Sequence, residues 1–548
     1  MESGYEERHL LLELQPHHPE SPMHAGARRG SWRACVLILA TELSETLAFA
    51  GIARNLVSYL TGELQESNAG AARDLSMWTG TCFLTPLVGA FLADSYWGRY
   101  TTVVVFMSIY SMGMITLTLS ASLPTLWSMG LRRAIVYLGL YLVAFGTGGI
   151  KPCVCPFGAE QFGGDDATDL AQTAAKASLF NWCFFCTNIG SMLASTLLVW
   201  VQDRVGWSSG FAIPAVVMAV ALAIFVGNKR LYHGIHHQKP RGSPLTGVCQ
   251  VLVAAARKRG AELPSDDVAI LHDKLPDGYS HRMEHSNGFK FLDKAAVVVT
   301  GDVADSTSST SPWRLSTVTQ VEEVKTLLRL STTLPTVIFF FAVTAQMSST
   351  FVEQGAAMDT RVVGRFAVPP ATLSSLEVTS ILLCIPAYEA VLLPLARRIT
   401  GDGRGLTQLR RLGVGLALST LTMAYMAMVE KRRLSAAERG VSISIVWQAP
   451  AYLVLGMAEV FTSVGLLEFY YDQSPDAMKS LCTAVSLVAV AAGNYLNSAI
   501  VAVVAWATTW IPQDLNRGRL DCFFWMMAGL SGLNLLAFIC SSMRYKYR

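Results

Sequence analysis

Residues 41–59 read TELSETLAFAGIARNLVSY and lie inside an apolar segment that runs from about Arg33 to Leu60. This segment is long enough to cross a lipid bilayer as a helix. It nevertheless carries two carboxylates, Glu42 and Glu45, and their spacing places both on one helix face. Because an ionisable residue in a spanning helix is costly, it is expected to face a bundle interior or a water-filled path. The alternative for Glu42 is a helix end among the lipid headgroups, but Glu45 lies deeper, so transport is the first hypothesis.

The composition also indicates a membrane protein. The chain has 548 residues, of which 52% are hydrophobic and only 15% are charged, and its mean hydropathy is +0.38. Soluble globular chains usually carry about 25% charged residues. The net charge of +3 gives no sign of a nucleic-acid partner. The eleven cysteines show neither zinc-ligand spacing nor a secreted disulfide framework. No nucleotide loop, metal cluster or nucleophile setting indicates an enzyme.

Twelve apolar segments are long enough to span a bilayer. A polar stretch of about a hundred residues separates the sixth from the seventh, which is the arrangement of a major-facilitator transporter with two halves around a central site. The twelve segments are roughly 33–61, 76–97, 101–121, 134–156, 177–201, 208–228, 333–355, 371–396, 410–430, 445–471, 479–506 and 521–543.

We therefore expect an all-α, polytopic membrane protein with the major facilitator superfamily fold. Two six-helix bundles, 33–228 and 333–543, are joined by a cytoplasmic linker, 229–332, and flanked by cytoplasmic tails, 1–32 and 544–548. Lys and Arg near most span ends fall on the side of the termini, which predicts that this side is cytoplasmic; Arg132, Arg133 and the 430–444 loop fall on the other side. In the linker, Pro240–Lys258 and Trp313–Arg329 are expected to form amphipathic helices at the membrane surface.

The N-terminal tail has no signal-peptide pattern. Two overlapping runs match an acidic dileucine sorting signal, in which leucines occupy the fourth and fifth positions after a carboxylate. The residues concerned are Glu6, Glu7, Leu10, Leu11 and Leu12. Because so short a pattern also arises by chance, the predicted location is the plasma membrane, with the vacuolar membrane as the alternative.

Two longer motifs resemble the signatures of the proton-dependent oligopeptide transporter family. Residues 145–152, FGTGGIKP, followed by 157–162, FGAEQF, are similar to the first signature, and 180–190, FNWCFFCTNIG, to the second. The stretch DSYWGR resembles the general major-facilitator loop between spans two and three, which implies a conformational role for Asp94 and Arg99.

Three further stretches are similar to the plant nitrate/peptide branch of that family. They are FLDKAA at 291–296, WRLSTVTQVEEV at 313–324 and LEFYYDQSP at 467–475. Within this branch the sequence most resembles the di- and tripeptide subfamily. The resemblance covers nearly all of residues 30–548 and implies a membrane transporter.

Lys151 is an ammonium deep in an apolar helix, next to Pro152. A buried charge without a partner costs several kcal/mol, so a carboxylate partner is expected. Glu459 in the tenth span is expected to be the only carboxylate at matching depth in the second half. The resemblance implies that this lysine and glutamate pair across the halves in one state. A static pair is the alternative, but a pair between halves that rock apart is more naturally a switch.

The resemblance also implies several substrate-binding residues. Gln346 in the seventh span lines the cavity in relatives, and Thr344 stands where a nitrate-transporting relative has a histidine. Phe49 and Ala50 stand where peptide-transporting relatives commonly have two tyrosines. The remaining candidates are Asn188, Trp447 and Ser463, with helix packing as the alternative for the first two.

The opening stretch departs from the family pattern, Glu-x-x-Glu followed by Arg or Lys, because Thr46 replaces the cation. A hydroxyl is too weak to hold a buried carboxylate ionised, so at least one of Glu42 and Glu45 is expected to stay protonated near neutral pH. Proton coupling would then shift to the Glu459 side, or transport would be facilitative with weak pH dependence. We expect weakened coupling, with Arg54, two turns further along, as a partial substitute.

Three classes of function follow from these residues. The first is a proton-coupled symporter of small peptides. The second is a transporter with the same fold for nitrate, a hormone, an amino-acid conjugate or a metabolite, which the missing cation and tyrosines favour. The third, a non-transporting sensor, is disfavoured because Lys151, Glu459 and Glu45 are all retained. The expected partners are a small-molecule or peptide substrate and the lipid bilayer, and no cofactor is expected besides the proton as coupling ion.

Overall fold

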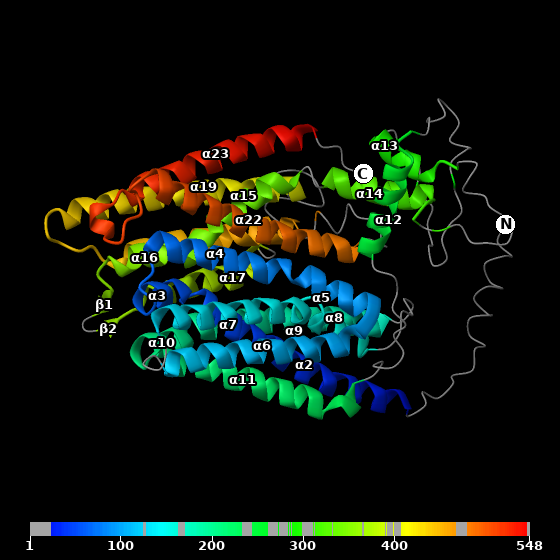
Figure 1. Cartoon of the computed structure of the whole chain (residues 1–548), viewed down its shortest axis with the longest axis horizontal. Helices are drawn as coiled ribbons and strands as arrows, with labels where there is room; N and C mark the ends of the chain where they lie inside the picture. The colour runs from blue at the N-terminus through cyan, green and yellow to red at the C-terminus, as the bar shows by residue number, and fades with distance from the viewer. Residues whose placement is uncertain are drawn as a thin grey trace.

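The computed structural model describes ten main stretches of the chain and a few single positions between them. These stretches are residues 23–123, 128–162, 170–232, 244–260, 288–298, 313–330, 333–363, 366–388, 407–466 and 479–544. The predicted dileucine motif at residues 6–12 lies outside them. Long helices run side by side, with a short hairpin at one end and the linker helices at the other (Figure 1). We call these the hairpin end and the linker end.

In the described part of the first half there are ten helices and two short π-helical turns. They are α2 (Met23–Ala53), α3 (Leu56–Gly62), α4 (Asn68–Leu84), α5 (Pro86–Leu92), η1 (Ala93–Trp97), α6 (Gly98–Ser122), α7 (Met129–Ile150), α8 (Val154–Glu160), α9 (Leu170–Leu193), η3 (Ala194–Leu198), α10 (Val199–Arg204) and α11 (Trp207–Gly227). Between η1 and α6 the chain turns at Gly98, whose φ of +73° lies in the region that favours glycine. That turn separates the second predicted span from the third.

The second half is also built of long helices interrupted by short 3₁₀- and π-helical turns, and it contains two short strands. Its elements are α15 (Leu334–Thr344), η8 (Ala345–Ser348), α16 (Thr350–Ala356), β1 (Arg361–Val363), β2 (Phe366–Ala367), η9 (Pro370–Leu373), α17 (Ser374–Ala387), α19 (Gln408–Ala437), η11 (Ile445–Gln448), α20 (Ala449–Glu459), η12 (Val460–Val464), α22 (Lys479–Ala507), η14 (Leu515–Arg517) and α23 (Leu520–Arg544). Strands β1 and β2 pair antiparallel and form the hairpin.

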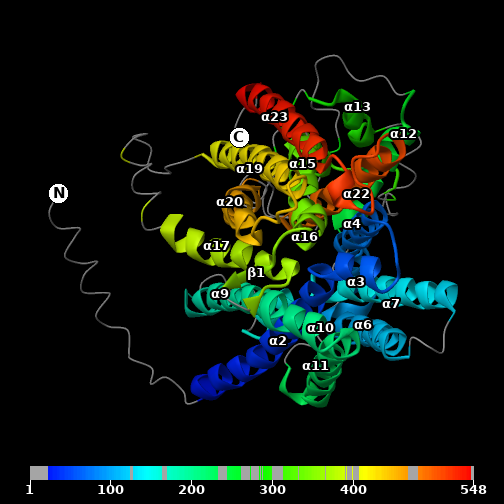
Figure 2. The same cartoon turned by 90° about the vertical axis from the view of Figure 1, so that its left-hand side faces the viewer.

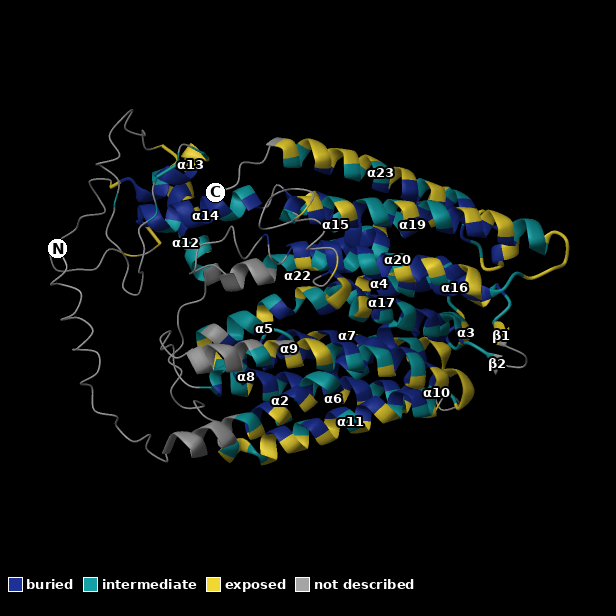
Figure 3. Ribbon diagram, turned by 180° about the vertical axis from the view of Figure 1, so that it is seen from behind, coloured by how far each residue is buried: buried dark blue, intermediate teal, exposed yellow. Residues whose placement is uncertain are grey.

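Among the described residues, eleven helical segments are long and apolar enough to cross a membrane. One of them, Asn68–Ser122, contains two of the predicted spans, so these segments account for all twelve. Viewed end-on, the helices of residues 23–227 form one group and those of 334–544 a second group beside it (Figure 2). Exposed residues, coloured yellow, gather on the outer faces of the bundle (Figure 3). Many are large and apolar, among them Val216, Leu533 and Leu536, as contact with lipid tails requires.

The linker contains two helices close to the predicted amphipathic segments. Helix α12 (Pro244–Arg257) agrees with the first predicted amphipathic helix, whereas α14 (Val318–Leu330) begins five residues after the start of the second. Together with α13 (Lys290–Asp293) and η6 (Lys294–Ala296), they bury their apolar faces against one another, in a core that includes Val251, Leu292 and Val321. The apolar faces of these helices are therefore buried in a small helical cluster. Their place at the membrane surface stays a prediction.

Candidate transport site

Lys151 follows α7 and lies beside α2, the helix of the opening stretch. Its Nζ is 3.9 Å from Oε1 of Glu45, which is almost fully buried. The same ammonium lies 4.2 Å from the ring centroid of Phe49 and 4.9 Å from that of Phe83. Aromatic faces attract cations. Lys151 is thus held by one carboxylate and two rings, all from the first half, and Phe49 contacts it although a tyrosine hydroxyl is missing.

The other acidic residue of the opening stretch has a different partner. Oε1 of Glu42 accepts a hydrogen bond of 3.4 Å from the hydroxyl of Thr187 on α9. Thr46 is buried at a close contact between α2 and α9, since a Cβ added to Gly190 would lie 3.1 Å from the Thr46 Cβ. The position that carries the cation in the family pattern is therefore part of a tight helix contact here.

Glu459 lies at the end of α20, and its neighbours differ from the prediction. Its charged neighbours are Glu377 on α17 and Arg54. The expectation that Glu459 is the only carboxylate at its depth in the second half is therefore wrong. The guanidinium of Arg54, which follows α2, donates a 2.5 Å hydrogen bond to Oε2 of Glu377. In this conformer Arg54 makes the cross-half ion pair, while Lys151 is paired within its own half.

Gln346 is fully buried in a chain of hydrogen bonds between the halves. Its Nε2 donates to Oδ1 of Asn497 at 2.5 Å, and its Oε1 accepts from the hydroxyl of Thr350 at 2.7 Å. The Nδ2 of Asn497 donates in turn to the hydroxyl of Ser76 on α4 at 2.9 Å. The Gln346 amide thus connects α15–α16 to α22 and α4, and its use in substrate binding stays a prediction.

The remaining predicted pocket residues are spread over the bundle. The Thr344 hydroxyl donates to the carbonyl of Phe341 on its own helix at 3.1 Å, and Nδ2 of Asn188 donates to the carbonyl of Phe184 at 2.8 Å. Ser463 is half-buried in η12. Trp447 lies in η11, before α20, with the guanidinium of Arg432 4.3 Å from its ring centroid. These contacts fit helix packing for Asn188 and Trp447, the alternative considered for both.

Arg99, in the predicted conformational loop, forms an ion pair with Glu160 at the end of α8. Glu160 stands inside the motif FGAEQF, so this pair connects two stretches on which the family resemblance rests. Asp94 is in η1, and its side chain lies outside the described part of the structure.

One group in the linker has the composition of a metal site, namely His285, Asp293 and Glu322, whose ligand atoms lie within 4.8 Å of one another. The ammonium of Lys325 is 2.6 Å from Oδ1 of Asp293 and 2.7 Å from Oε1 of Glu322. Because this buried ammonium contacts both carboxylates and the guanidinium of Arg329 lies 3.9 Å from Oε2 of Glu322, the cluster is explained as the polar centre of the linker helices.

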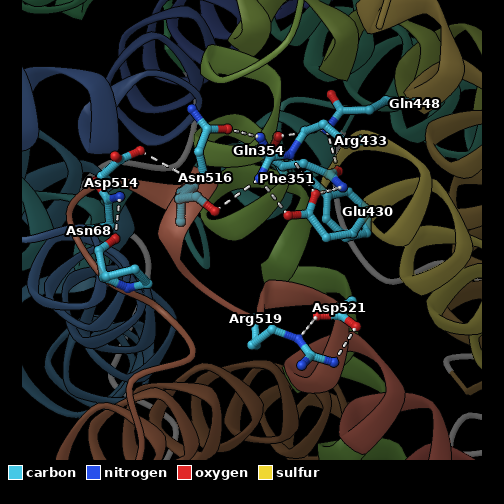
Figure 4. Close-up of polar contacts among 12 residues, drawn as sticks. Asn68, Phe351, Gln354, Glu430, Arg433, Gln448, Asp514, Asn516, Arg519 and Asp521 are labelled. Atoms are coloured by element: carbon cyan, nitrogen blue, oxygen red, sulfur yellow. Dashed lines mark hydrogen bonds and ion pairs between the residues drawn. The ribbon is translucent and has the colours of Figure 1, made fainter. Parts of the chain in front are cut away.

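Several contacts join the halves toward the hairpin end. The amide of Asn68 donates to the carbonyl of Pro512 at 3.1 Å, and Arg204 donates to the carbonyl of Ala367 at 3.4 Å. The segment around Pro512 is itself anchored, since Arg433 donates to Oδ1 of Asn516 at 2.6 Å (Figure 4).

The anchor of that segment is a buried ion pair on α19. The guanidinium of Arg433 donates to both carboxylate oxygens of Glu430, at 2.7 and 2.9 Å. Nε2 of Gln354 donates to Oε2 of Glu430 at 2.6 Å, and Gln448 donates to Gln354 at 2.7 Å (Figure 4). This network ties α16, α19, η11 and the loop before α23 together.

Sequence reasoning missed the most prominent cross-half pair. Glu377 is absent from the predicted site residues, and Arg54 is predicted only as a substitute for the missing cation. The available signal was the same one that identified Glu45: a charged residue within or next to an apolar span. Phe83, the second ring on Lys151, carried no such signal.

The comparisons with known proteins agree with this architecture. The family model described as "POT family" matches residues 100–516. Among curated relatives, the Arabidopsis thaliana protein NRT1/PTR FAMILY 8.5 is 47% identical and the alignment covers 94% of this chain and 90% of the relative. NRT1/PTR FAMILY 8.3 from the same plant is 46% identical, with 95% and 92% covered.

Solved structures show the same fold. The crystal structure of an auto-inhibited POT family peptide transporter aligns with a TM-score of 0.69 at 25% identity and covers 94% of this chain and 98% of that one. The POT family transporter PepTSo aligns with a TM-score of 0.71 at 23% identity over 94% and 99%. The resemblance seen in the motifs is thereby confirmed, as are the major-facilitator fold and the expectation that the protein is not an enzyme. The chain belongs to the POT family of membrane transporters.

Proposed function

We propose that this protein is a proton-coupled symporter of small peptides that works by alternating access. The observation that carries the proposal is the placement of opposite charges on the two halves. Lys151, with the rings of Phe49 and Phe83 against it, comes from the first half, and Glu459 comes from the second. A dipeptide carries a carboxylate at one end and an ammonium at the other, so it complements both. That several solved relatives are described as peptide transporters supports the same substrate class.

The direction of opening follows from the contacts between the halves. Asn68–Pro512 and Arg204–Ala367 lie toward the hairpin end. The excess of Lys and Arg near span ends supports a cytosolic linker end. We therefore place the hairpin end outside the cytosol, closed by these contacts in this conformer, with the plasma membrane as the proposed location and the vacuolar membrane as the alternative.

A different small solute is the second candidate, and one observation favours it. Phe49 contacts Lys151 without a hydroxyl, so the aromatic wall offers fewer hydrogen bonds than the two tyrosines of peptide-transporting relatives. Nitrate is a less suitable solute than a larger organic anion, because Thr344 offers no imidazole and its hydroxyl already bonds its own helix.

Uptake into oocytes separates these candidates. Labelled dialanine and labelled nitrate are supplied at acidic and at neutral outside pH. We expect dialanine uptake that rises at acidic pH and no nitrate uptake above that of uninjected cells. Nitrate uptake without dialanine uptake would overturn the peptide proposal, and uptake of neither would favour another solute or a sensor.

A further inference from the structure

A cavity of about 400 Å³ lies at the hairpin end of the first half. Charged and polar side chains from the turn between α3 and α4, from the start of α4 and from the start of α7 line it; they are Gln65, Glu66, Ser67, Arg73, Asp74 and Arg133. Asp74 lies nine residues before Phe83 on α4, or about 14 Å along the helix axis, so the cavity is separate from the Lys151 site. Cavities of about 300–1,000 Å³ hold small molecules.

Two carboxylates in the cavity share one proton donor. The hydroxyl of Tyr137 on α7 contacts Oε1 of Glu66 at 2.9 Å and also contacts Oδ2 of Asp74. A phenol has a single proton, so it can donate to only one of the two carboxylates at a time. Among the described residues, no other donor contacts the Glu66 carboxylate. An ammonium group, which has three N–H donors and no acceptor, would supply the missing donor.

The two guanidinium groups of the cavity have donors to spare. Arg133 donates from Nη2 to the carbonyl of Leu64 at 2.7 Å, and its buried Nε has no hydrogen-bond partner among the described residues. Arg73 is half-exposed and donates from Nε to Oδ1 of Asp74 at 2.7 Å, which leaves its terminal nitrogens without a protein partner in the described part of the chain. Guanidinium groups bind carboxylates and phosphates strongly and often through two parallel hydrogen bonds. The cavity thus combines a place for a cation with a place for an anion.

The turn beside the cavity leads directly to a contact between the halves. Ser67 caps α4, since its hydroxyl accepts from the amide of Gly70 at 3.1 Å. The next residue, Asn68, donates to the carbonyl of Pro512 in the second half. Gln65 and Ser67 are exposed. The cavity is therefore accessible at the hairpin end while the contact between Asn68 and Pro512 is closed.

We propose that this cavity, hereafter the outer cavity, binds a zwitterion that carries a primary ammonium and a nearby carboxylate or phosphate. Glu66 and Asp74 bind the ammonium, and Arg73 and Arg133 bind the anionic group. The outer cavity is a second site, so the inference does not depend on the solute that is carried at Lys151.

Two sources offer this chemistry. One is a free dipeptide, which carries both charges. The other is the ethanolamine phosphate headgroup of a phospholipid, because exposed apolar side chains follow on the same helices, Met77 on α4 and Leu138 on α7, as contact with lipid tails requires. The experiment below distinguishes these sources.

Equilibrium dialysis with labelled dialanine tests the outer cavity in the full-length protein, purified in detergent and freed of phospholipid. Lys151→Ala removes the ammonium of the transport site, so the binding that remains reports the outer cavity. We expect one bound dialanine per Lys151→Ala protein. Adding Asp74→Asn should weaken this binding about tenfold or more, because a hydrogen bond to a charged group is lost. In a protein that keeps Lys151, Asp74→Asn alone should lower the number of bound dialanine molecules by one.

Two control variants separate binding from a structural role. Asp203→Asn removes an exposed carboxylate at the same end, paired with Arg204 at 3.4 Å and outside the lining of the cavity, and should leave binding unchanged. Tyr137→Phe removes the shared hydroxyl but keeps both carboxylates, so dialanine should still bind. Equal loss of dialanine binding and of melting temperature in Tyr137→Phe and Asp74→Asn would show that these groups only hold α4 to α7, and would overturn the inference.

Changes to the ligand test which charges are recognised. N-acetyl-dialanine lacks the ammonium and dialanine amide lacks the carboxylate, so each should bind about tenfold more weakly than dialanine. Glycerophosphoethanolamine should displace dialanine, whereas glycerophosphocholine should not, because its quaternary ammonium has no N–H donor. If reconstitution in phosphatidylethanolamine vesicles, but not in phosphatidylcholine vesicles, removes the dialanine site, the lipid headgroup is the occupant. Equal dialanine binding in both vesicles identifies the free peptide.

The remaining outcomes separate the inference from the proposed function. The inference is overturned if Lys151→Ala binds neither dialanine nor glycerophosphoethanolamine, if Asp74→Asn changes nothing, or if N-acetyl-dialanine binds as well as dialanine. None of these results affects peptide transport at Lys151. A wild-type protein that binds dialanine in the outer cavity but never transports it would overturn the proposed function alone.

Discussion

The ammonium of Lys151 lies 3.9 Å from Glu45 and 4.2 Å from the centroid of the Phe49 ring, inside the first half of the transporter. The lysine is therefore engaged while Glu459 faces Glu377 and Arg54. The two predicted partners belong to separate charge centres in this conformer. A pair between Lys151 and Glu459 would require both centres to rearrange, as two-state transporters do between their conformers.

Removal of the Lys151 ammonium should abolish concentrative uptake. Lys151→Ala removes the ammonium that is proposed to complement the substrate carboxylate, and it leaves the buried carboxyl group of Glu45 without its cation. We expect uptake driven by a proton gradient to fall by about tenfold or more, with the protein still present at the cell surface and a lower apparent melting temperature. The measurement is dialanine uptake normalised to surface protein. Near-normal uptake would show that the pair is only structural, and Lys229→Ala, far along the chain in an exposed turn, serves as the control.

Close helix packing accounts for the glycines of the FGTGGIKP motif, because their neighbours leave no room for a side chain. A Cβ on Gly148 would lie 2.8 Å from the Thr85 carbonyl oxygen, and one on Gly149 would lie 2.3 Å from the Phe106 ring. Gly148→Ala should therefore destabilise the protein by about 1–3 kcal/mol through overpacking. Gly130→Ala on the same helix, where nothing lies within 4 Å of the added carbon, should not. Thermal unfolding in detergent compares the two, and equal melting temperatures would contradict this account.

The buried Glu430–Arg433 pair on α19 should contribute strongly to the stability of the hairpin end. In Glu430→Gln the guanidinium of Arg433 stays buried without its carboxylate, which typically costs about 3–5 kcal/mol. Arg517→Gln removes an arginine from a solvent-exposed pair with Asp514 and should change little. Melting temperature and the yield of monodisperse protein measure both variants. A Glu430→Gln protein as stable as the wild type would mean that the network in Figure 4 contributes little.

The sequence predicts the long helices and the two halves because membrane spans leave a strong apolar signal. It also identifies Glu45 and Lys151, since each charge interrupts such a span. The sequence does not reveal the Arg54–Glu377 pair, because the two residues are 323 positions apart and meet only when the two halves pack against each other. For the same reason, the depth of each residue along its own span did not reveal that Glu377 is a neighbour of Glu459. Gln346 shows the reverse case: its place in the span was predicted, but its hydrogen bonds depend on α22 and α4.

The dileucine runs in the N-terminal tail predict a sorting experiment. If the plasma membrane is the location, replacing Leu10, Leu11 and Leu12 by alanine leaves a fluorescent fusion at the cell surface. A dileucine signal would instead hold the wild type at the vacuolar membrane and release the variant to the surface. Imaging of both fusions in plant cells decides between the two, and a shift from vacuole to surface would contradict the plasma-membrane proposal. Leu14→Ala, which removes a leucine outside both runs, is the control.

Thr46→Arg restores the family pattern beside Glu45 and tests what its absence means. The added guanidinium would hold the Glu45 carboxyl group ionised and compete with Lys151 for it. If the missing cation weakens coupling, the variant should show a steeper dependence of dialanine uptake on outside pH than the wild type. If Arg54 already substitutes for the missing cation, the wild type is strongly pH dependent and the added arginine gains nothing. Thr46→Gln, of similar length but uncharged, controls for crowding against Gly190, where α2 and α9 are in tight contact. Strong uphill uptake by the wild type, unchanged in Thr46→Arg, would therefore contradict the expectation of weakened coupling and agree with Arg54 as the substitute for that cation.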